Sequence, residues 1–204
     1  MTVDIRKRVN ETIDRVRNFD FGGWLDERVK FSELPFMGTP DYMFKLGYWT
    51  GGMVAAAFFW QIISGILLLM YYEPSNAYES TEYIISKVAF GKVLLASHLY
   101  GAYAMIFLMF VHLFRNYFVG AYKKPRELQW VLGVIMGALV LGIAFFGYSL
   151  VGDTLSVDGV DVAKGILQGA PLGGVLLSIF FGPGGQGAQY TRVYSWHLTM
   201  TWFV

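Results

Sequence analysis

The chain has 204 residues, of which 55 % are hydrophobic and only 15 % are charged, against about 25 % charged residues in an ordinary soluble domain. A soluble domain of this length could not bury so much apolar surface, so the composition argues against both a water-soluble enzyme and a disordered chain. The net charge of +1 gives no indication of nucleic-acid binding. Because the sequence has no Cys, disulfides, iron–sulfur clusters and thiolate-linked cofactors are excluded within it.

The N-terminal segment, residues 1–45, holds about half of the charged residues, with eight basic and eight acidic side chains. Ile5, Val9, Ile13 and Val16 recur at helical spacing, which predicts an amphipathic helix. Two interpretations stay open. The helix lies in the membrane interface, or it packs on a partner subunit.

Four apolar stretches fill residues 46–204, which we interpret as one membrane domain. Three of them, about 46–72, 93–114 and 128–151, reach the ~20 residues that a helix needs to cross a bilayer. The fourth begins near Val193 and stops at Val204. A free carboxylate there would lie inside hydrocarbon, so we expect this helix to continue beyond the given sequence. The sequence thus predicts an all-α membrane protein built as a four-helix transmembrane bundle.

The charges of the connections predict how the chain is oriented. The connection 115–127 has four basic residues against one acidic residue, which places it, together with the N-terminus, on the cytoplasmic, stromal or matrix side. Among these, we expect the cytoplasmic side of a bacterial or archaeal cell membrane. The connections 73–92 and 152–189 then face the opposite side. The longer of these two is rich in Gly but has an apolar run at 175–181, and we expect it to form short helices near the membrane surface.

Two His residues lie in the second stretch, His98 and His112. Fourteen helical steps bring the two rings to within about 40° of the same face and separate them by about 21 Å along the axis. One ring is therefore near each side of a ~30 Å hydrocarbon core. A single membrane His is equally well explained by a hydrogen bond between helices, but two on one stripe favour ligands.

Pairs of Gly residues repeat the same spacing of fourteen on the neighbouring stretches: Gly51 with Gly65, and Gly133 with Gly147. Gly allows a bulky flat group to approach a helix backbone closely. Together with His98 and His112, these pairs predict two stacked sites for planar cofactors. The alternative is ordinary helix packing through small residues.

The third His, His197, lies near the start of the fourth stretch, at the same end of the bundle as His98. The two can therefore ligate one iron from opposite faces. For His112, a partner is expected near position 211 or 212 on the continuing helix. Two imidazoles leave no open position on the iron, which suits electron transfer.

The chain resembles the N-terminal part of cytochrome b, and among its forms the short cytochrome b6. The resemblance covers about residues 19–204, and its most specific block is FGKVLLASHLYGAYAMIFLMFVHLFRNYFVGAYKKPRELQWVLGVIMG at 90–137. QIISG at 61–65, FFGYSL at 145–150 and TRVYSWH at 191–197 add to it.

The resemblance implies two b haems held by His ligands. His98 and His197 would hold the low-potential haem, and His112 the high-potential one. The four paired Gly residues would pack against the haems, and Arg115 and Arg192 would lie near haem propionates. Because the Cys that anchors a covalent third haem in the split form is replaced by Trp49, no covalent haem is expected.

The resemblance also implies the reaction. A quinol gives one electron to a Rieske iron–sulfur protein and then a c-type cytochrome or a plastocyanin-like acceptor. The other electron crosses the membrane through the two haems, coupled to proton translocation. The quinol site is expected at Tyr148, Asp153 and Gly159. The other implied partners are the lipid bilayer, a C-terminal cytochrome b or subunit IV-like segment, and a second copy in a homodimeric complex.

One departure from the family falls close to this quinol site. GYSLVGD stands where the family usually has GYxLPWD, so that Val151 and Gly152 replace Pro and Trp. This keeps open an alternative: a cytochrome b-like dihaem anchor that serves another oxidoreductase, for example a nitrate reductase, without splitting the electron pair. A haem-free channel or transporter is a third alternative, disfavoured because the spans have no charged residues in their cores.

Overall fold

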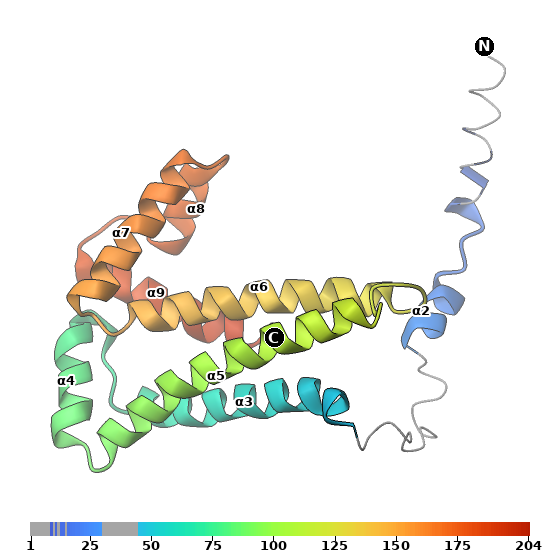
Figure 1. The fold of residues 1–204 in the computed structure, drawn as a ribbon. Coiled ribbons are helices and arrows are strands. Elements are labelled where there is room, and N and C mark those ends of the chain that lie inside the picture. Colours follow the sequence, from blue (N-terminus) through green and yellow to red (C-terminus); the bar gives the residue numbers. More distant parts are fainter. Residues whose placement is uncertain (1–8, 10, 12, 15, 30–44) are drawn as a thin grey trace.

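The computed structural model describes residues 9, 11, 13, 14, 16–29 and 45–204, and all regular elements within them are helices (Figure 1). The expected all-α fold is therefore confirmed. In chain order, the elements are α2 (Phe21–Val29), α3 (Leu46–Leu69), the short 3₁₀ helix η3 (Pro74–Asn76), α4 (Ala77–Lys87), α5 (Gly91–Phe118), α6 (Glu127–Ser149), α7 (Thr154–Gly169), α8 (Gly173–Phe180) and α9 (Gln186–Thr201).

Three helices, α3, α5 and α6, are long and apolar enough to cross a membrane. They coincide with the first three predicted spans to within a few residues, because an unbroken apolar run can satisfy its backbone only as a helix. The helix α9 has 16 residues and begins at Gln186, ahead of the apolar stretch expected from Val193. A fourth membrane span therefore stays a prediction.

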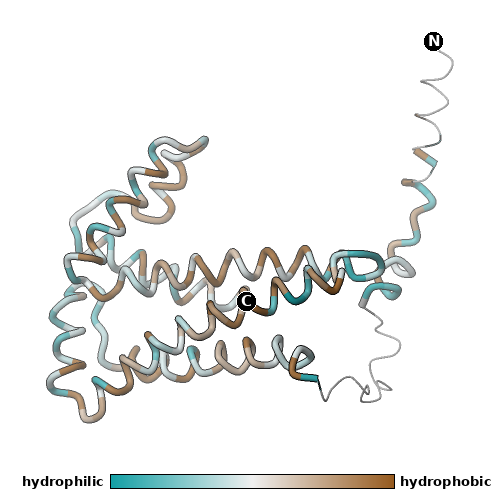
Figure 2. The backbone as a smooth tube through the Cα atoms, viewed as in Figure 1, coloured by the Kyte–Doolittle hydropathy of each residue, from teal (hydrophilic) through white to brown (hydrophobic). Residues whose placement is uncertain are grey.

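The long helices pack as two antiparallel pairs, α3 with α5 and α6 with α9, while α5 and α6 touch more sparsely (Figure 1). The membrane-capable helices bury few side chains. In the most apolar 18-residue stretch of each helix, between 6 % and 17 % of the residues are buried. Figure 2 shows hydrophobic positions along all three of them. In lipid such surfaces carry no hydrophobic penalty, so the outer faces are suited to contact with lipid or with other subunits.

The connections group at the two ends of the helix pairs. The helices α4, α7 and α8 lie at one end, and α2 lies at the other, beside the turn between α5 and α6 (Figure 1). This grouping agrees with the predicted topology, whereas the compartment that each end faces stays a prediction. Helices α7 and α8 confirm that the 152–189 connection is helical. Its position at the membrane surface stays a prediction.

An ion pair fixes α2 against α6. Arg28 donates from Nε to Glu127 Oε1 over 2.9 Å, and its guanidinium lies 4.4 Å from the ring centre of Trp24. The amide of Gln129 donates to the Arg28 carbonyl over 3.3 Å. The helix α2, which precedes the first membrane-capable helix in the chain, is therefore anchored to the third one, α6.

Part of the predicted amphipathic helix falls on described residues. Val9, Ile13 and Val16 are helical and exposed, whereas Ile5 lies outside the described residues. Nothing in the described part of the chain covers their apolar face, so both interpretations of this helix stay open.

The best-packed region joins η3 and α4 to α6, α7 and α9. Its buried side chains include Phe146, Val160 and Val193. Tyr72 donates to the Leu150 carbonyl over 2.7 Å, closing the α3–α4 connection onto the end of α6. Burial, reinforced by two neighbouring Tyr side chains, raises the pKa of the Tyr72 phenol, which therefore stays a neutral donor. This region holds the ends of the two helix pairs in register.

Candidate functional site

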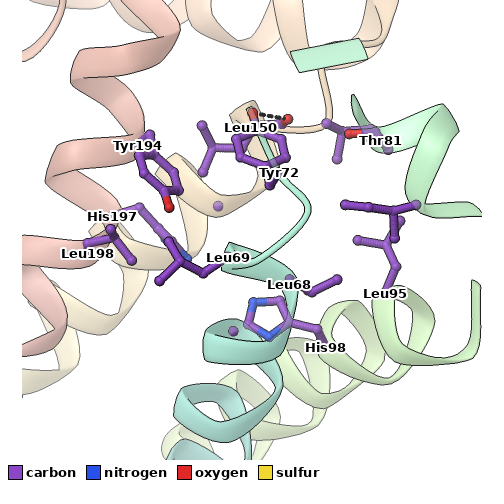
Figure 3. Close-up of a pocket in the computed structure, with 14 residues that line it drawn as sticks. Leu68, Leu69, Tyr72, Thr81, Leu95, His98, Leu150, Tyr194, His197 and Leu198 are labelled. Atoms are coloured by element: carbon purple, nitrogen blue, oxygen red, sulfur yellow. Dashed lines mark hydrogen bonds between the residues drawn. The ribbon is translucent and has the colours of Figure 1, made fainter. Parts of the chain in front are cut away.

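An apolar cavity lies between the two helix pairs, close to the end formed by α4. The space between its walls is about 640 Å³, part of which is open to the surroundings. Figure 3 shows His98 from α5 and His197 from α9 at this cavity. Most of the lining side chains are aliphatic, and a few are polar. The lining residues are Gly65, Leu68, Leu69, Tyr72, Thr81, Ile84, Leu95, His98, Gly147, Leu150, Val151, Tyr194, His197 and Leu198.

The separation of the two rings fits one iron atom. The ring centres of His98 and His197 are 6.4 Å apart. Two metal–nitrogen bonds of about 2 Å, plus about 1 Å from each nitrogen to its ring centre, add up to about 6 Å. The residues present therefore fit a planar iron cofactor held between two imidazoles.

The hydrogen bonds of these two rings leave the Nε2 lone pair, which would bind a metal, available on each ring. The Nδ1 of His197 lies 2.9 Å from the Ile143 carbonyl, which can only accept, so Nδ1 carries the proton. The Nδ1 of His98 lies 2.8 Å from Ser64 Oγ, whose own proton is donated to the Trp60 carbonyl. Each ring therefore donates from Nδ1 and keeps the Nε2 lone pair available, which is the usual arrangement of a metal-binding His.

The third predicted ligand, His112, lies toward the opposite end of α5. Its Nδ1 lies 3.0 Å from Thr50 Oγ1 on α3, and its Nε2 lies 2.9 Å from Asn116 Nδ2. Within the described residues no second His faces it, so its expected ligand partner stays a prediction.

Three of the four predicted Gly residues lie directly against a His ring. A Cβ at Gly51 would come within 2.9 Å of His112 Cε1, and one at Gly147 within 2.7 Å of His197 Cε1. A Cβ at Gly65 would lie 3.3 Å from the corresponding atom of His98. Gly133 has nothing within 4 Å of such a Cβ and faces open space. At three of the four positions, therefore, an added side chain would displace a His ring.

The two candidate propionate partners have different surroundings. Arg115 donates from Nη1 to Asn116 Oδ1 over 2.9 Å, next to His112. Arg192 donates to the carbonyls of Phe181 and Pro183 over 2.7 and 2.6 Å. It therefore ties the turn after α8 to α9. A propionate contact stays a prediction for both.

The three predicted quinol-site residues, Tyr148, Asp153 and Gly159, lie at the end of α6 and the first turns of α7. A Cβ at Gly159 would lie 3.3 Å from Tyr148 Cε1, so the Tyr148 ring is against α7. Asp153 caps α7 by accepting a hydrogen bond from the Ser156 amide over 2.8 Å. Its carboxylate therefore has a structural role that sequence reasoning did not assign.

The family departure at Gly152 has a geometric reason. Its φ is +77°, in the left-handed region that favours Gly, and a Cβ there would lie 2.7 Å from the amide nitrogen of Tyr78. The turn after α6 passes this close to α4, so a side chain at Gly152 would force the two apart.

Sequence reasoning missed the hydrogen-bond partners of the His rings. Thr50 and Ser64 each directly precede one of the paired Gly residues, so the same spacing of fourteen marked them as well. The Ile143 carbonyl carries no sequence signal, because every residue has a carbonyl. Asn116, four residues after His112 and hence on the same helix face, could have been found.

The fold and the site define a class of protein: an integral membrane helix bundle whose His rings meet at an apolar cofactor cavity. A family model described as cytochrome b (N-terminal)/b6/petB matches residues 103–204. Cytochrome b6 of Mastigocladus laminosus is 33 % identical over 189 residues, covering 89 % of this chain and 88 % of that protein. The chain belongs to the cytochrome b N-terminal/b6 family.

Further relatives agree with this assignment. Cytochrome b of Sulfolobus acidocaldarius is 48 % identical over 190 residues, covering 87 % of this chain. The menaquinol:cytochrome c reductase cytochrome b subunit of Bacillus subtilis is 36 % identical over 190 residues, 86 % of this chain and 85 % of that subunit. A solved structure titled hyperthermophilic respiratory Complex III matches with a TM-score of 0.70 and 28 % identity, over 88 % of this chain.

The chain spans only part of some of these relatives. It covers 34 % of the Sulfolobus cytochrome b and 50 % of the matched chain of the solved structure. Membership in the family implies binding of b-type haem and a role in electron transport.

Proposed function

We propose that this chain forms the haem-binding part of a cytochrome b subunit that oxidises quinol and passes electrons across the membrane. The observation that carries the proposal is the 6.4 Å separation of the His98 and His197 rings across an apolar cavity. Two imidazole ligands leave no site for oxygen or substrate on the metal, so this centre is suited to carrying single electrons.

The second haem is assigned to His112, with a second ligand from a residue outside the 204. Gly51 beside His112, and the open space at Gly133, support a flat group at this depth. Two such centres at the two ends of α5 would span most of the hydrocarbon core. In this proposal the pair at His98 is the low-potential centre and that at His112 the high-potential one.

The chain's own residues bind, orient and exclude water. The Ile143 carbonyl and Ser64 hold the rings of His197 and His98 with Nε2 available. Aliphatic side chains such as Leu68 and Leu95 line the cavity and keep water out, which lowers the local dielectric and tunes the reduction potential. Bound haem supplies the one-electron chemistry.

The quinol site is proposed where Tyr148 lies against Gly159 at the start of α7. It is on the same end of the bundle as His98, so a quinol there would be close to the low-potential centre.

The remaining parts of the proposal are a Rieske iron–sulfur protein, a c-type cytochrome, a C-terminal cytochrome b or subunit IV-like segment, a homodimeric complex and proton translocation. The α4 end faces away from the cytoplasm, and the α2 end toward it.

Single His variants of the intact complex test the assignment of ligands. His98→Ala and His197→Ala should each remove the same low-potential component from a redox titration of the b-haem absorbance, while His112→Ala should remove the other. If His98→Ala and His197→Ala remove different components, the shared-iron assignment is wrong. Loss of both components in all three variants, with the complex still assembled, would also contradict it.

A further inference from the structure

A buried hydroxyl in the first span contacts His112. Thr50 is only 8 % exposed, and its Oγ1 donates to the Gly47 carbonyl over 3.0 Å. A hydroxyl has a single proton to donate. While this proton goes to the Gly47 carbonyl, the oxygen accepts from the Nδ1 of His112, 3.0 Å away, which then carries the ring proton.

The other nitrogen of the ring gives an independent indication of the same tautomer. Arg115 donates to Asn116 Oδ1 over 2.9 Å, which turns the amide nitrogen of Asn116 toward His112. That nitrogen lies 2.9 Å from Nε2 of the ring and can only donate. Nε2 therefore holds the lone pair, as an iron ligand must.

The two contacts differ in what happens when a metal binds. The Asn116 amide uses the lone pair that iron would take, so it must leave Nε2 when iron binds. The Thr50 contact is on the opposite side of the ring and is compatible with ligation. In the loaded site, Thr50 is the contact that continues to hold the ring.

The same arrangement occurs at His98, toward the other end of α5. Ser64 is fully buried and lies fourteen residues after Thr50, and its proton goes to the Trp60 carbonyl over 2.7 Å. Its oxygen accepts from His98 Nδ1 over 2.8 Å. Each hydroxyl is followed directly by a Gly against the same ring. The hydroxyl orients the ligand ring, and the Gly makes room for it.

We propose that Thr50 is a positioning residue for the high-potential haem: it fixes the tautomer of His112 and lowers the reduction potential of that haem. The physical basis is that an acceptor at Nδ1–H makes the imidazole a stronger donor, which stabilises ferric iron. The inference rests on the proposed function, because it requires haem at His112.

The test is a redox titration of the b-haem absorbance in the purified intact complex. Thr50→Val keeps the shape of the side chain and removes the acceptor. We expect it to favour ferrous iron by up to about tenfold at the haem of His112, a positive shift of up to about 59 mV for one electron. The other haem, in the same sample, should keep its potential, and Thr50→Ser should restore the wild-type value.

A second variant keeps the test decisive if Thr50→Val loses its haem. Ser64→Ala should shift the potential of the other haem and leave that of His112 unchanged. The inference is overturned if Thr50→Val moves neither potential or moves both equally, or if Thr50→Ser behaves like Thr50→Val. Loss of haem in Thr50→Val together with an unchanged potential in Ser64→Ala would overturn it as well. A wild-type complex with fewer than two b haems per chain would instead overturn the proposed function.

Discussion

The clearance at Gly147 gives a graded prediction for haem binding. A Cβ at this position would lie 2.7 Å from His197 Cε1. Ordinary contact begins at about 3.4 Å, so in Gly147→Ala the ring must retreat by about 0.7 Å. Metal-ligand distances tolerate only about 0.2 Å. The retreat therefore exceeds what one iron between two fixed rings can absorb.

The retreat also pulls the ring away from the Ile143 carbonyl that orients it. Changes around a metal ligand typically cost 10–100-fold in affinity, and we expect a loss of this size for the haem held by His197. The assay is the amplitude of the low-potential component of the b-haem spectrum per copy of the chain, in the purified complex. In Gly65→Ala the added Cβ would lie 3.3 Å from His98 Cε1, so this variant should lose less of the low-potential component.

Gly133→Ala is the matched control. It lies on the same helix, fourteen residues earlier, and an added Cβ meets nothing within 4 Å. It should leave the low-potential component at its wild-type amplitude. If Gly147→Ala retains that component in full, or if Gly133→Ala loses as much of it as Gly147→Ala, the argument from clearance is refuted.

Three further predictions concern the α4 end of the molecule. Arg192→Gln should lower the thermal stability of the complex in detergent, by about 1.5–3 kcal/mol for each charged hydrogen bond lost, and an unchanged melting curve would contradict the tie to the turn after α8. Asp153→Ala should lose the cap of α7, about 1 kcal/mol, whereas Asp153→Asn should keep it; a fall in quinol oxidation in Asp153→Asn at full stability would instead indicate a proton-accepting role. Tyr72→Phe should cost about 1 kcal/mol at neutral pH. Because burial raises the pKa of Tyr72 above its usual 10.0, its stabilising effect is present below pH 10 and lost as the pH rises above it, so the stability difference from Tyr72→Phe should shrink in alkaline melts.

The spacing of fourteen was enough to predict most of the residues that the structure brings together at the His rings. It identified His98 and His112 on one stripe of a helix. Of the four paired Gly residues that it identified, the structure places Gly51, Gly65 and Gly147 against His rings, but not Gly133. The prediction works because helical geometry is rigid: a fixed number of steps sets both the direction and the depth of a side chain.

Other features could not be derived from the pattern. The apolar stretch predicted a start near Val193, but α9 begins at Gln186, because the polar first turns of this helix lie beside η3 and outside the apolar run. The carbonyl contacts of Arg192 and the role of Gly152 depend on how two connections meet in space. Such tertiary contacts leave no local period in the sequence.

The central claim is that this chain carries one haem between His98 and His197 and a second at His112. Its most direct test is a pyridine haemochrome assay on the purified complex, counting b haem per copy of the chain. The account predicts two haems per copy, with two separate components in the redox titration. One haem per copy would contradict the electron path across the membrane, and none would leave the His and Gly residues as ordinary helix-packing groups.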